Sequence, residues 1–357
     1  MYVVSVVGAR PQFVKLGPVA KEMAAAGVRH EIIHTGQHYD LDMSDSFFRD
    51  LGIPNPDYNL GVGSGTHGAQ TGRMLETIED VLSKNSPDWL LVYGDTNSTL
   101  AAAIAGVKLR VPVAHLEAGL RSFNRAMPEE HNRVLTDHAA DLCLAPTTVA
   151  ASHLEAEGLQ HRTVITGDVM TDVCLLVSEK VKGRPLPTSV PFKEGQYVLA
   201  TLHRAENVDD GAVLTKIAES LEEIDYPVVL PVHPRLLARC QSMGIDLAGR
   251  GIHTTSPMNY PDLIRTVLSA RAVITDSGGL QKEAFLLRTP CVTLRAETEW
   301  VETVELGWNT LCPQGENLSA VLDSLHPRDT RATPYGSGNA ASVVVETLQK
   351  WKTNSNQ

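Results

Sequence analysis

The sequence predicts an α/β protein built from two doubly wound, Rossmann-like domains that face each other across a cleft. Short apolar runs alternate with helical stretches along the whole chain. These runs are apolar on both faces, which is typical of parallel strands buried between helices. With 357 residues, the chain is long enough for two domains with separate cores.

Six candidate strands lie in each half of the chain. In the first half the expected strands are Tyr2–Val7, Arg29–His34, Trp89–Tyr93, Val111–His115, Asp141–Leu144 and Arg162–Ile165. In the second half they are Tyr197–Leu202, Pro227–Pro231, Ile252–Thr254, Ala272–Thr275, Cys291–Leu294 and Thr310–Cys312. Helices are expected between them, such as Gln12–Ala26, Ala69–Ser83 and Thr99–Lys108.

The best candidate for a linker is the stretch Leu175–Glu194, whose end is rich in Pro, Gly and Lys. It predicts an N-terminal domain over residues 1–170, which carries the acid/base residues, and a C-terminal domain over residues 171–338. A last helical pattern, residues 339–353, is expected to pack back onto the first domain.

Composition and charge argue against several classes of function. A formal net charge of −11 argues against a nucleic-acid partner. No apolar run approaches the roughly 20 residues that span a bilayer, and the N-terminus lacks the basic region of a secretory signal. The five cysteines are widely spaced without a CxxC pair, which favours reduced core thiols in a cytoplasmic protein.

Three carboxylates stand at predicted turns of the first domain. Asp95 follows the strand WLLVY through a glycine, and it could serve only as a capping acid. Glu117 stands between an apolar strand and Ala-Gly, where a half-buried carboxylate suits proton transfer. Glu129 follows Pro128 at a helix start, with Arg133 on the same face four residues on; a simple ion pair is the alternative.

The first expected strand runs into Gly8-Ala9-Arg10-Pro11 and then a helix. Arg10 and Lys15 lie where a phosphate could meet positive charge together with the amides of the helix N-terminus. Solvated surface charges are an equally good interpretation of these two residues.

Polar residues also end the strands of the second domain. His203 and Arg204 follow YVLATL, and His233 follows the next strand. Each histidine could donate to a phosphate or move a proton.

The segment Asp276-Ser277-Gly278-Gly279 opens a helix whose amides can bind a phosphate, and Glu283 could accept from ribose hydroxyls. A plain helix cap is the alternative for this strand–DSGG–helix segment.

Other sites are not supported by the sequence. Histidine–carboxylate clusters could suggest a metal site, but neither HExxH nor CxxC occurs, so no metal is expected. The GxGxxG match at Gly63–Gly68 lacks a preceding apolar strand, so we interpret it as a loop before a helix rather than a dinucleotide site.

Several blocks together resemble a known family. GARPQFVK, TGQHYD, YGDTNST, HLEAGLRS, MPEEHNR, LHRAEN and DSGGLQKEA are similar to blocks of the non-hydrolysing UDP-N-acetylglucosamine 2-epimerases, in order and over roughly residues 1 to 350. The resemblance implies the two-domain fold also seen in GT-B glycosyltransferases. It also implies a UDP-sugar substrate, a homodimer, and no redox cofactor or metal.

The resemblance implies residue roles as well. UDP would be held by Arg10 and by second-domain residues, namely His203, Ser277, Gly278, Gly279 and Glu283. Asp95, Glu117 and Glu129 would share the acid/base work, positioned by Arg133. The family reaction removes the C2 proton as UDP leaves C1, and it then reverses both steps on the opposite face.

Departures from the family pattern leave the substrate open. SFNRAM is short, Trp300 stands where many members have arginine, and Asp40 stands where many have glutamine. Allosteric activation by a second UDP-GlcNAc is therefore in question. With TEWVE and QKEAF, these features resemble a subgroup acting on UDP-2,3-diacetamido-2,3-dideoxyglucuronate. A GT-B glycosyltransferase, a hydrolysing epimerase and an inactive nucleotide-sugar sensor are further alternatives.

Overall fold

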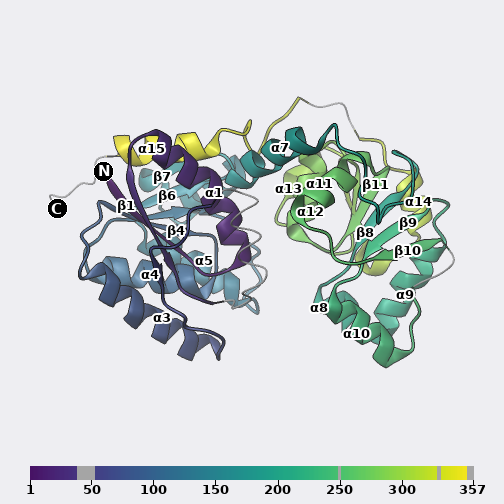
Figure 1. Ribbon diagram of the computed structural model, residues 1–357, viewed down its shortest axis with the longest axis horizontal. Helices are drawn as coiled ribbons and strands as arrows, with labels where there is room; N and C mark the ends of the chain where they lie inside the picture. Colours follow the sequence, from purple (N-terminus) through teal and green to yellow (C-terminus); the bar gives the residue numbers. More distant parts are fainter. Residues whose placement is uncertain (38–52, 248–250, 328–330, 352–357) are drawn as a thin grey trace. The chain divides into compact units, whose positions relative to one another are not determined.

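The computed structural model describes residues 1–37, 53–247, 251–327 and 331–351, with the backbone alone at Arg10. The chain forms two compact units (Figure 1). Unit 1 comprises Met1–Val173 and Thr333–Gln357, and unit 2 comprises Cys174–Ala332. Within the described residues, no helix has the length and apolar character needed to cross a membrane.

Unit 1 is built on a parallel sheet in the order β3-β2-β1-β4-β5-β6-β7. Its strands are β1 Tyr2–Val7, β2 Arg29–His34, β3 Tyr58–Asn59, β4 Trp89–Tyr93, β5 Val113–Leu116, β6 Leu142–Ala145 and β7 Thr163–Ile165. Its helical segments are α1 Arg10–Ala25, α3 His67–Leu82, α4 Asn97–Lys108, α5 Pro128–Ala139, α6 Thr148–Ala156, η1 Gln160–Arg162 and α15 Ala340–Lys350. The helix α7, Val169–Val181, begins in unit 1 and continues into unit 2.

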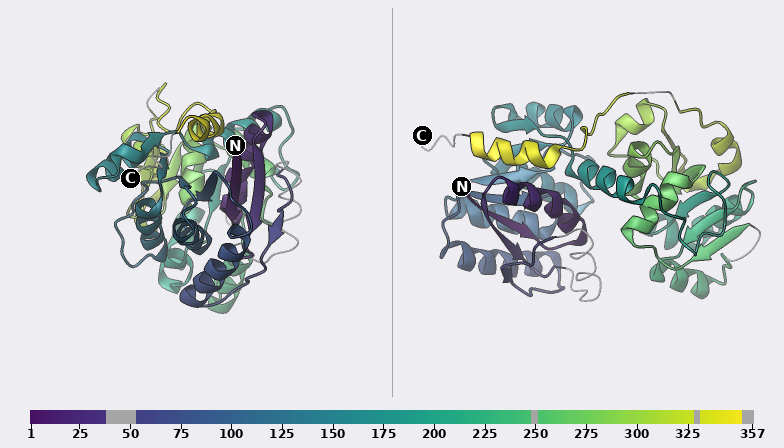
Figure 2. Two further views of the ribbon diagram at one scale, coloured as in Figure 1. Left: turned by 90° about the vertical axis from the view of Figure 1, so that its left-hand side faces the viewer. Right: turned by 45° about the horizontal axis from the view of Figure 1, so that its top comes forward.

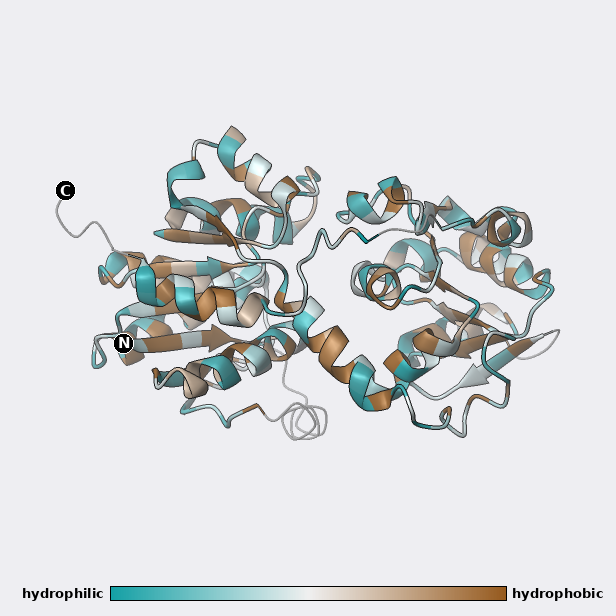
Figure 3. Ribbon diagram, turned by 90° about the horizontal axis from the view of Figure 1, so that it is seen from above, coloured by the Kyte–Doolittle hydropathy of each residue, from teal (hydrophilic) through white to brown (hydrophobic). Residues whose placement is uncertain are grey.

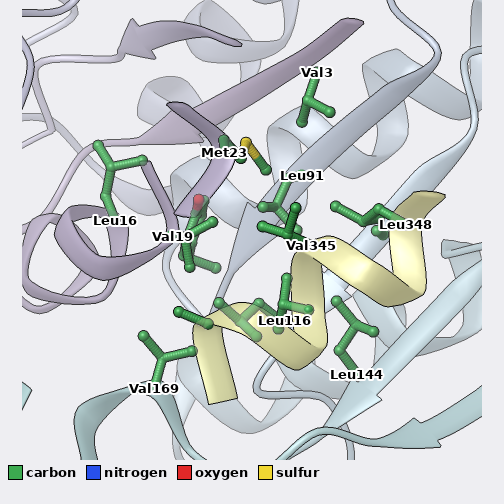
Figure 4. Packing of buried hydrophobic residues seen from close by; sticks show 14 of the residues in the cluster. Val3, Leu16, Val19, Met23, Leu91, Leu116, Leu144, Val169, Val345 and Leu348 are labelled. Carbon is green, nitrogen blue, oxygen red and sulfur yellow. The ribbon is translucent and has the colours of Figure 1, made fainter. Parts of the chain in front are cut away.

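Helices cover both faces of the first sheet, because alternate strand residues point to opposite sides. Val3 and Val7 of β1 belong to one apolar cluster with α1 and α15, whereas Val4 and Val6 belong to another with α3 and α4. Figure 4 shows Val345 of α15 among the residues of the first cluster.

The C-terminal helix α15 thus completes the core of unit 1. It packs beside α1, as both views of Figure 2 show. The indole nitrogen of Trp89 donates to the carbonyl of Leu348 over 3.2 Å. At the other end of the helix, Asp172 accepts from the amides of Ala340 and Ala341. The last part of the chain therefore belongs to the first folding unit.

Unit 2 has a second parallel sheet, in the order β10-β9-β8-β11-β12-β13. Its strands are β8 Val198–Thr201, β9 Val228–Pro231, β10 Ile252–Thr255, β11 Ala272–Thr275, β12 Cys291–Thr293 and β13 Asn309–Leu311. Its helical segments are α8 Ala205–Val208, α9 Gly211–Glu222, α10 Pro234–Met243, α11 Tyr260–Ser269, α12 Gly278–Leu286, α13 Val301–Glu305, η2 Pro313–Gly315 and α14 Leu318–Asp323. Figure 3 shows apolar strands in both units.

The fold class predicted from the sequence is confirmed: each unit is a parallel-sheet, Rossmann-like α/β structure. Strands β1, β2, β4 and β11 begin and end at the predicted residues. The sequence missed β3, which has only two residues and is too short to show a period. The first part of the expected linker, Leu175–Val181, is the end of the helix α7.

Candidate active site

Glu117 occupies the turn that follows β5. Its backbone φ of 72° lies in the left-handed region, which is uncommon for a residue with a side chain. The carboxylate pairs with the ammonium group of Lys15, from α1, and both side chains are nearly buried. Burial by itself lowers the pKa of Lys15, but the adjacent Glu117 raises it more, so the net direction is upward. The sequence did not predict this ion pair.

Two glycines leave room for the Glu117 turn. Gly94, after β4, has a φ of 62°, and a Cβ there would lie 3.2 Å from Glu117 Oε2 and 3.5 Å from Lys15 Nζ. Gly119 has a φ of 83°, and a Cβ there would lie 2.3 Å from the carbonyl oxygen of Ala150. Side chains at either position would displace the turn.

Asp95 follows Gly94 and pairs with Arg133 of α5. Arg133 Nη2 lies 2.6 Å from Asp95 Oδ2, and its Nη1 lies 3.0 Å from Glu130 Oε2. The alternative interpretation, an ion pair between Glu129 and Arg133, is wrong, since Arg133 contacts the next acid, Glu130. The helix α4 is capped by Thr96 instead of Asp95, which leaves Asp95 available for a site.

Glu129 and Glu130 are neighbours at the start of α5 but have different environments. Glu130 is buried and accepts from the amides of Ser122 and Phe123, each over 2.9 Å, which fixes the preceding loop. Glu129 is half-buried in the first turn, where an acid also favours the helix dipole.

At the start of α1, two backbone amides have partners within the protein. The side chain of Gln12 accepts from the amides of Gly8 and Ala9, over 2.7 and 3.0 Å. These two donors are therefore already satisfied within the protein. Lys15 faces Glu117, and the side chain of Arg10 lies outside the described part of the chain, as do His38 and Asp40.

In unit 2, Asp276 organises the end of β8. Its fully buried carboxylate accepts from the amides of His203 and Arg204, over 3.0 and 2.9 Å, and lies 2.8 Å from His203 Nδ1. Burial by itself raises the pKa of Asp276, but these hydrogen bonds lower it more, so its net direction is down. Asp276 thereby holds both predicted residues of this strand end.

The DSGG turn opens α12, as the sequence predicted. Ser277 is the N-cap, and its hydroxyl accepts from the amide of Leu280 over 3.4 Å. Gly278 is partly accessible and Gly279 is exposed. A Cβ at Gly278 would lie 3.8 Å from the guanidinium of Arg295, a cation that the sequence did not single out.

Two acids flank this helix start. Glu299 pairs with Arg295 over 2.9 Å and lies 4.0 Å from Arg204. Glu283 is buried one turn into α12 and accepts from the Tyr260 hydroxyl over 2.8 Å. The Tyr260 contact was also missed, because Tyr260 lies at the start of α11, 23 residues before Glu283 in the sequence.

His233 has a local structural contact. It is the exposed N-cap of α10, and its Nδ1 accepts from the amide of Arg235 over 3.3 Å. The neighbouring Arg235 and Arg239 pair with Asp209 of unit 2.

Comparison with known proteins identifies the family. The family model described as UDP-N-acetylglucosamine 2-epimerase matches residues 21–349. The chain belongs to this family. It is 45% identical to UDP-2,3-diacetamido-2,3-dideoxy-D-glucuronate 2-epimerase of Pseudomonas aeruginosa, over 98% of this chain and 100% of that enzyme. It is 40% identical to UDP-N-acetylglucosamine 2-epimerase of Methanocaldococcus jannaschii, over 96% and 97% of the two chains.

A solved structure of the family extends the likeness to three dimensions. The crystal structure of the Methanocaldococcus jannaschii UDP-GlcNAc 2-epimerase in complex with UDP-GlcNAc and UDP aligns with a TM-score of 0.87 and 39% identity. The alignment covers 98% of this chain and 99% of that one. The family resemblance drawn from the sequence blocks is therefore confirmed.

Proposed function

We propose that the protein is a non-hydrolysing 2-epimerase that interconverts UDP-N-acetylglucosamine and UDP-N-acetylmannosamine. The C2 proton is removed as UDP leaves C1, which yields a 2-acetamidoglucal; UDP then adds back to C1 and C2 takes a proton on the opposite face. The presence of Asp95, Glu117 and Glu129 around the strand ends of unit 1 carries the proposal. Inversion at C2 needs a base on one face and an acid on the other.

Glu117 is the proposed base. Its carboxylate pairs with the buried ammonium of Lys15, which fixes the position of the carboxylate before the step. As UDP departs, positive character develops near C1, and the C2 proton becomes easier to remove. Asp95 and Glu129 are then available for the return of the proton and for stabilising charge on the sugar.

Unit 2 is proposed to bind the UDP moiety. Its supporting features are His203 and Arg204 on the buried Asp276, and the exposed start of α12 at Ser277-Gly278-Gly279. Amides at a helix N-terminus and nearby cations favour a diphosphate, and they stabilise it further as a leaving group. Glu283 is the proposed ribose ligand, and Arg10 of unit 1 the further phosphate ligand.

A second substrate has its own support. The same chemistry on UDP-2,3-diacetamido-2,3-dideoxyglucuronate is supported by the 45% identity to the enzyme of that name. Trp300 also departs from the arginine of many members. Its ring is buried, with Lys282 Nζ 4.0 Å from the ring centre.

Proton NMR in D2O tests both substrates directly. The purified protein is incubated with each UDP-sugar in turn, and the sugar signals are followed. We expect the 2-epimer to appear with deuterium at C2. The substrate with the larger kcat/KM is then the assigned one. Free sugar as product would instead indicate a hydrolysing epimerase. Tight UDP binding without turnover of either compound would contradict the proposed activity.

We also propose a cytoplasmic homodimer. The family resemblance implies the dimer, and the five buried, free cysteines suit a reducing compartment. Light scattering coupled to size exclusion is expected to give a mass twice that of one chain, and the mass of a single chain would contradict the dimer.

A further inference from the structure

A fully buried histidine lies beneath the Glu117 turn. His115 is the third residue of β5, and neither its ring nor the carboxylate of Asp137 is exposed. Its Nδ1 lies 2.6 Å from Asp137 Oδ1, and its Nε2 lies 2.7 Å from the carbonyl oxygen of Gly94. Carbonyl and carboxylate oxygens accept, so both ring nitrogens donate. The ring has no atom left for a ligand.

Asp137 uses its second oxygen in a similar way. Oδ2 accepts from the amide of Gly119 over 3.1 Å and lies 2.7 Å from Arg121 Nη1. Burial by itself raises the pKa of Asp137, but its contacts with His115 and Arg121 lower it more, so the carboxyl is ionised. The hydrogen bonds of the pair therefore reach residues on both sides of the Glu117 turn.

The same two residues connect every element that carries a proposed acid or base. The turn after β4 carries Asp95, the turn after β5 carries Glu117, and α5 carries both Glu129 and Asp137. His115 binds the carbonyl of the first turn, and Asp137 binds an amide of the second turn from its place on α5. One buried pair thus links the three elements that carry these carboxylates, beside the direct contact of Arg133 with Asp95.

The Glu117 turn needs such support. A residue with a side chain in the left-handed region is strained, and it persists only where its surroundings hold it. Glu117 has a φ of 72°. Its amide donates to the carbonyl of Leu144 over 3.1 Å, and the hydrogen bonds of the His115–Asp137 pair flank it on both sides.

We propose that His115 and Asp137 are positioning residues for proton transfer at C2, which hold Glu117 in place between the turn after β4 and the helix α5 without touching the substrate. The inference rests on the proposed function, in which Glu117 removes the C2 proton. An ordinary buried pair would contribute to stability alone, and its loss would not act through Glu117.

The His115→Asn variant isolates the bond to Gly94. Asparagine can still donate to Asp137, but it is too short to reach the Gly94 carbonyl. We expect kcat to fall by about tenfold or more, with KM within about threefold of wild type, because a misplacement of ~1 Å can cost ~10²-fold in rate. His30→Asn is the matched control, since His30 is a half-buried histidine of β2 bonded to the Ser5 hydroxyl over 2.8 Å. It is expected to lower the unfolding temperature and to leave kcat unchanged.

A double-mutant cycle separates positioning from stability. If His115 acts through Glu117, the His115→Asn/Glu117→Gln double variant turns over no more slowly than Glu117→Gln alone, within about twofold. The inference is overturned if the kcat losses of the two single variants multiply in the double variant, or if kcat is unchanged in His115→Asn. Turnover by the wild-type protein would still leave the proposed function intact. A wild type inactive on both UDP-sugars would overturn the proposed function, and this role with it.

Asp137→Asn provides an independent second variant. It preserves volume but replaces one acceptor with a donor, so the bond from Gly119 or from His115 is lost. The same loss of kcat and the same non-additivity with Glu117→Gln are expected. Failure of both His115→Asn and Asp137→Asn to fold, beside a folded His30→Asn, would show that the pair serves the fold itself and would overturn the positioning role.

Discussion

Each unit of the protein has an aspartate–histidine pair at a strand end, and the two pairs differ in exposure. In unit 1 the His115 side chain is 0% exposed and bonds to Asp137 and to the Gly94 carbonyl. In unit 2 the His203 side chain is 49% exposed, although its partner Asp276 is fully buried. The buried His115–Asp137 pair, the closed pair, can act only on the protein. The His203–Asp276 pair, the open pair, can contact a ligand.

The same contrast extends to the charges around each pair. In unit 1 two of the proposed acid/base residues form ion pairs with cations, Glu117 with Lys15 and Asp95 with Arg133. In unit 2 the proposed diphosphate site is made of backbone amides at the start of α12, beside the buried Arg295 and the partly buried Arg204. In the proposed function, unit 1 therefore supplies carboxylates whose positions are fixed before any substrate arrives, and unit 2 receives the diphosphate. The following predictions test that division.

The largest expected effect belongs to Glu117→Gln. Turnover should fall by at least roughly a hundredfold, because the base is lost, while UDP affinity stays near that of wild type. Steady-state kinetics and calorimetric titration with UDP measure the two quantities. The buried Lys15 also loses its partner, so the assays belong well below the unfolding temperature.

Glu31→Gln is the control for this variant. Glu31 is an ion-paired acid of β2, bonded to Arg29 and to the Tyr2 hydroxyl. It should retain full turnover. Wild-type turnover in Glu117→Gln would remove Glu117 from the acid/base set. A large loss of UDP affinity would show that unit 1 also binds UDP, contrary to the proposed division of roles between the units.

Gly94→Ala should have the next largest effect. Alanine at a φ of 62° costs about 1–2 kcal/mol, and its Cβ would crowd Glu117 Oε2 at 3.2 Å. We expect kcat to fall about tenfold with KM little changed. Gly27→Ala has the same strain, with a φ of 65° and open space around its Cβ, so it should lower stability alone. Equal kcat losses in both variants would mean that crowding of Glu117 is unimportant.

Asp276→Asn tests the open pair. It weakens the hydrogen bonds that position His203 and Arg204, so we expect UDP to bind about three- to tenfold more weakly, the size of one ordinary hydrogen bond. Asp210→Asn is the control, because Asp210 caps α9 in the same unit and asparagine caps as well. Unaltered UDP affinity, measured by calorimetry, would argue that unit 2 does not bind UDP through this strand end.

Much of the fold could be predicted because parallel strands carry a local signal. Runs apolar on both faces gave the strands, and strand-end residues such as Asp95, Glu117 and Ser277 were found because each directly follows such a run. The DSGG turn was recognisable for the same reason. The two-residue strand β3 has no such period and was missed.

Partners distant in sequence could not be predicted. Lys15 and Glu117 are 102 residues apart, and His203 and Asp276 are 73 apart, so only the folded sheet brings them together. The choice of Glu130 over Glu129 as the partner of Arg133 depends on which side of α5 faces inward. Adjacent helix positions differ by about 100° in direction, which a short acidic run does not reveal.

The smallest expected effect is in acid stability, where both aspartates should behave alike. The pKa of Asp137 and that of Asp276 are lowered in the folded protein. Their contribution to stability is therefore fully present above the unfolded-state pKa of about 3.9, and it is lost as the pH falls through the lower folded values. Thermal unfolding followed by circular dichroism from pH 6 to 3 should show this decline, with flatter curves for Asp137→Asn and Asp276→Asn. A flatter curve for one variant alone would mean that the other aspartate is not an ionised partner of its histidine, and the two pairs would then differ in charge as well as in exposure.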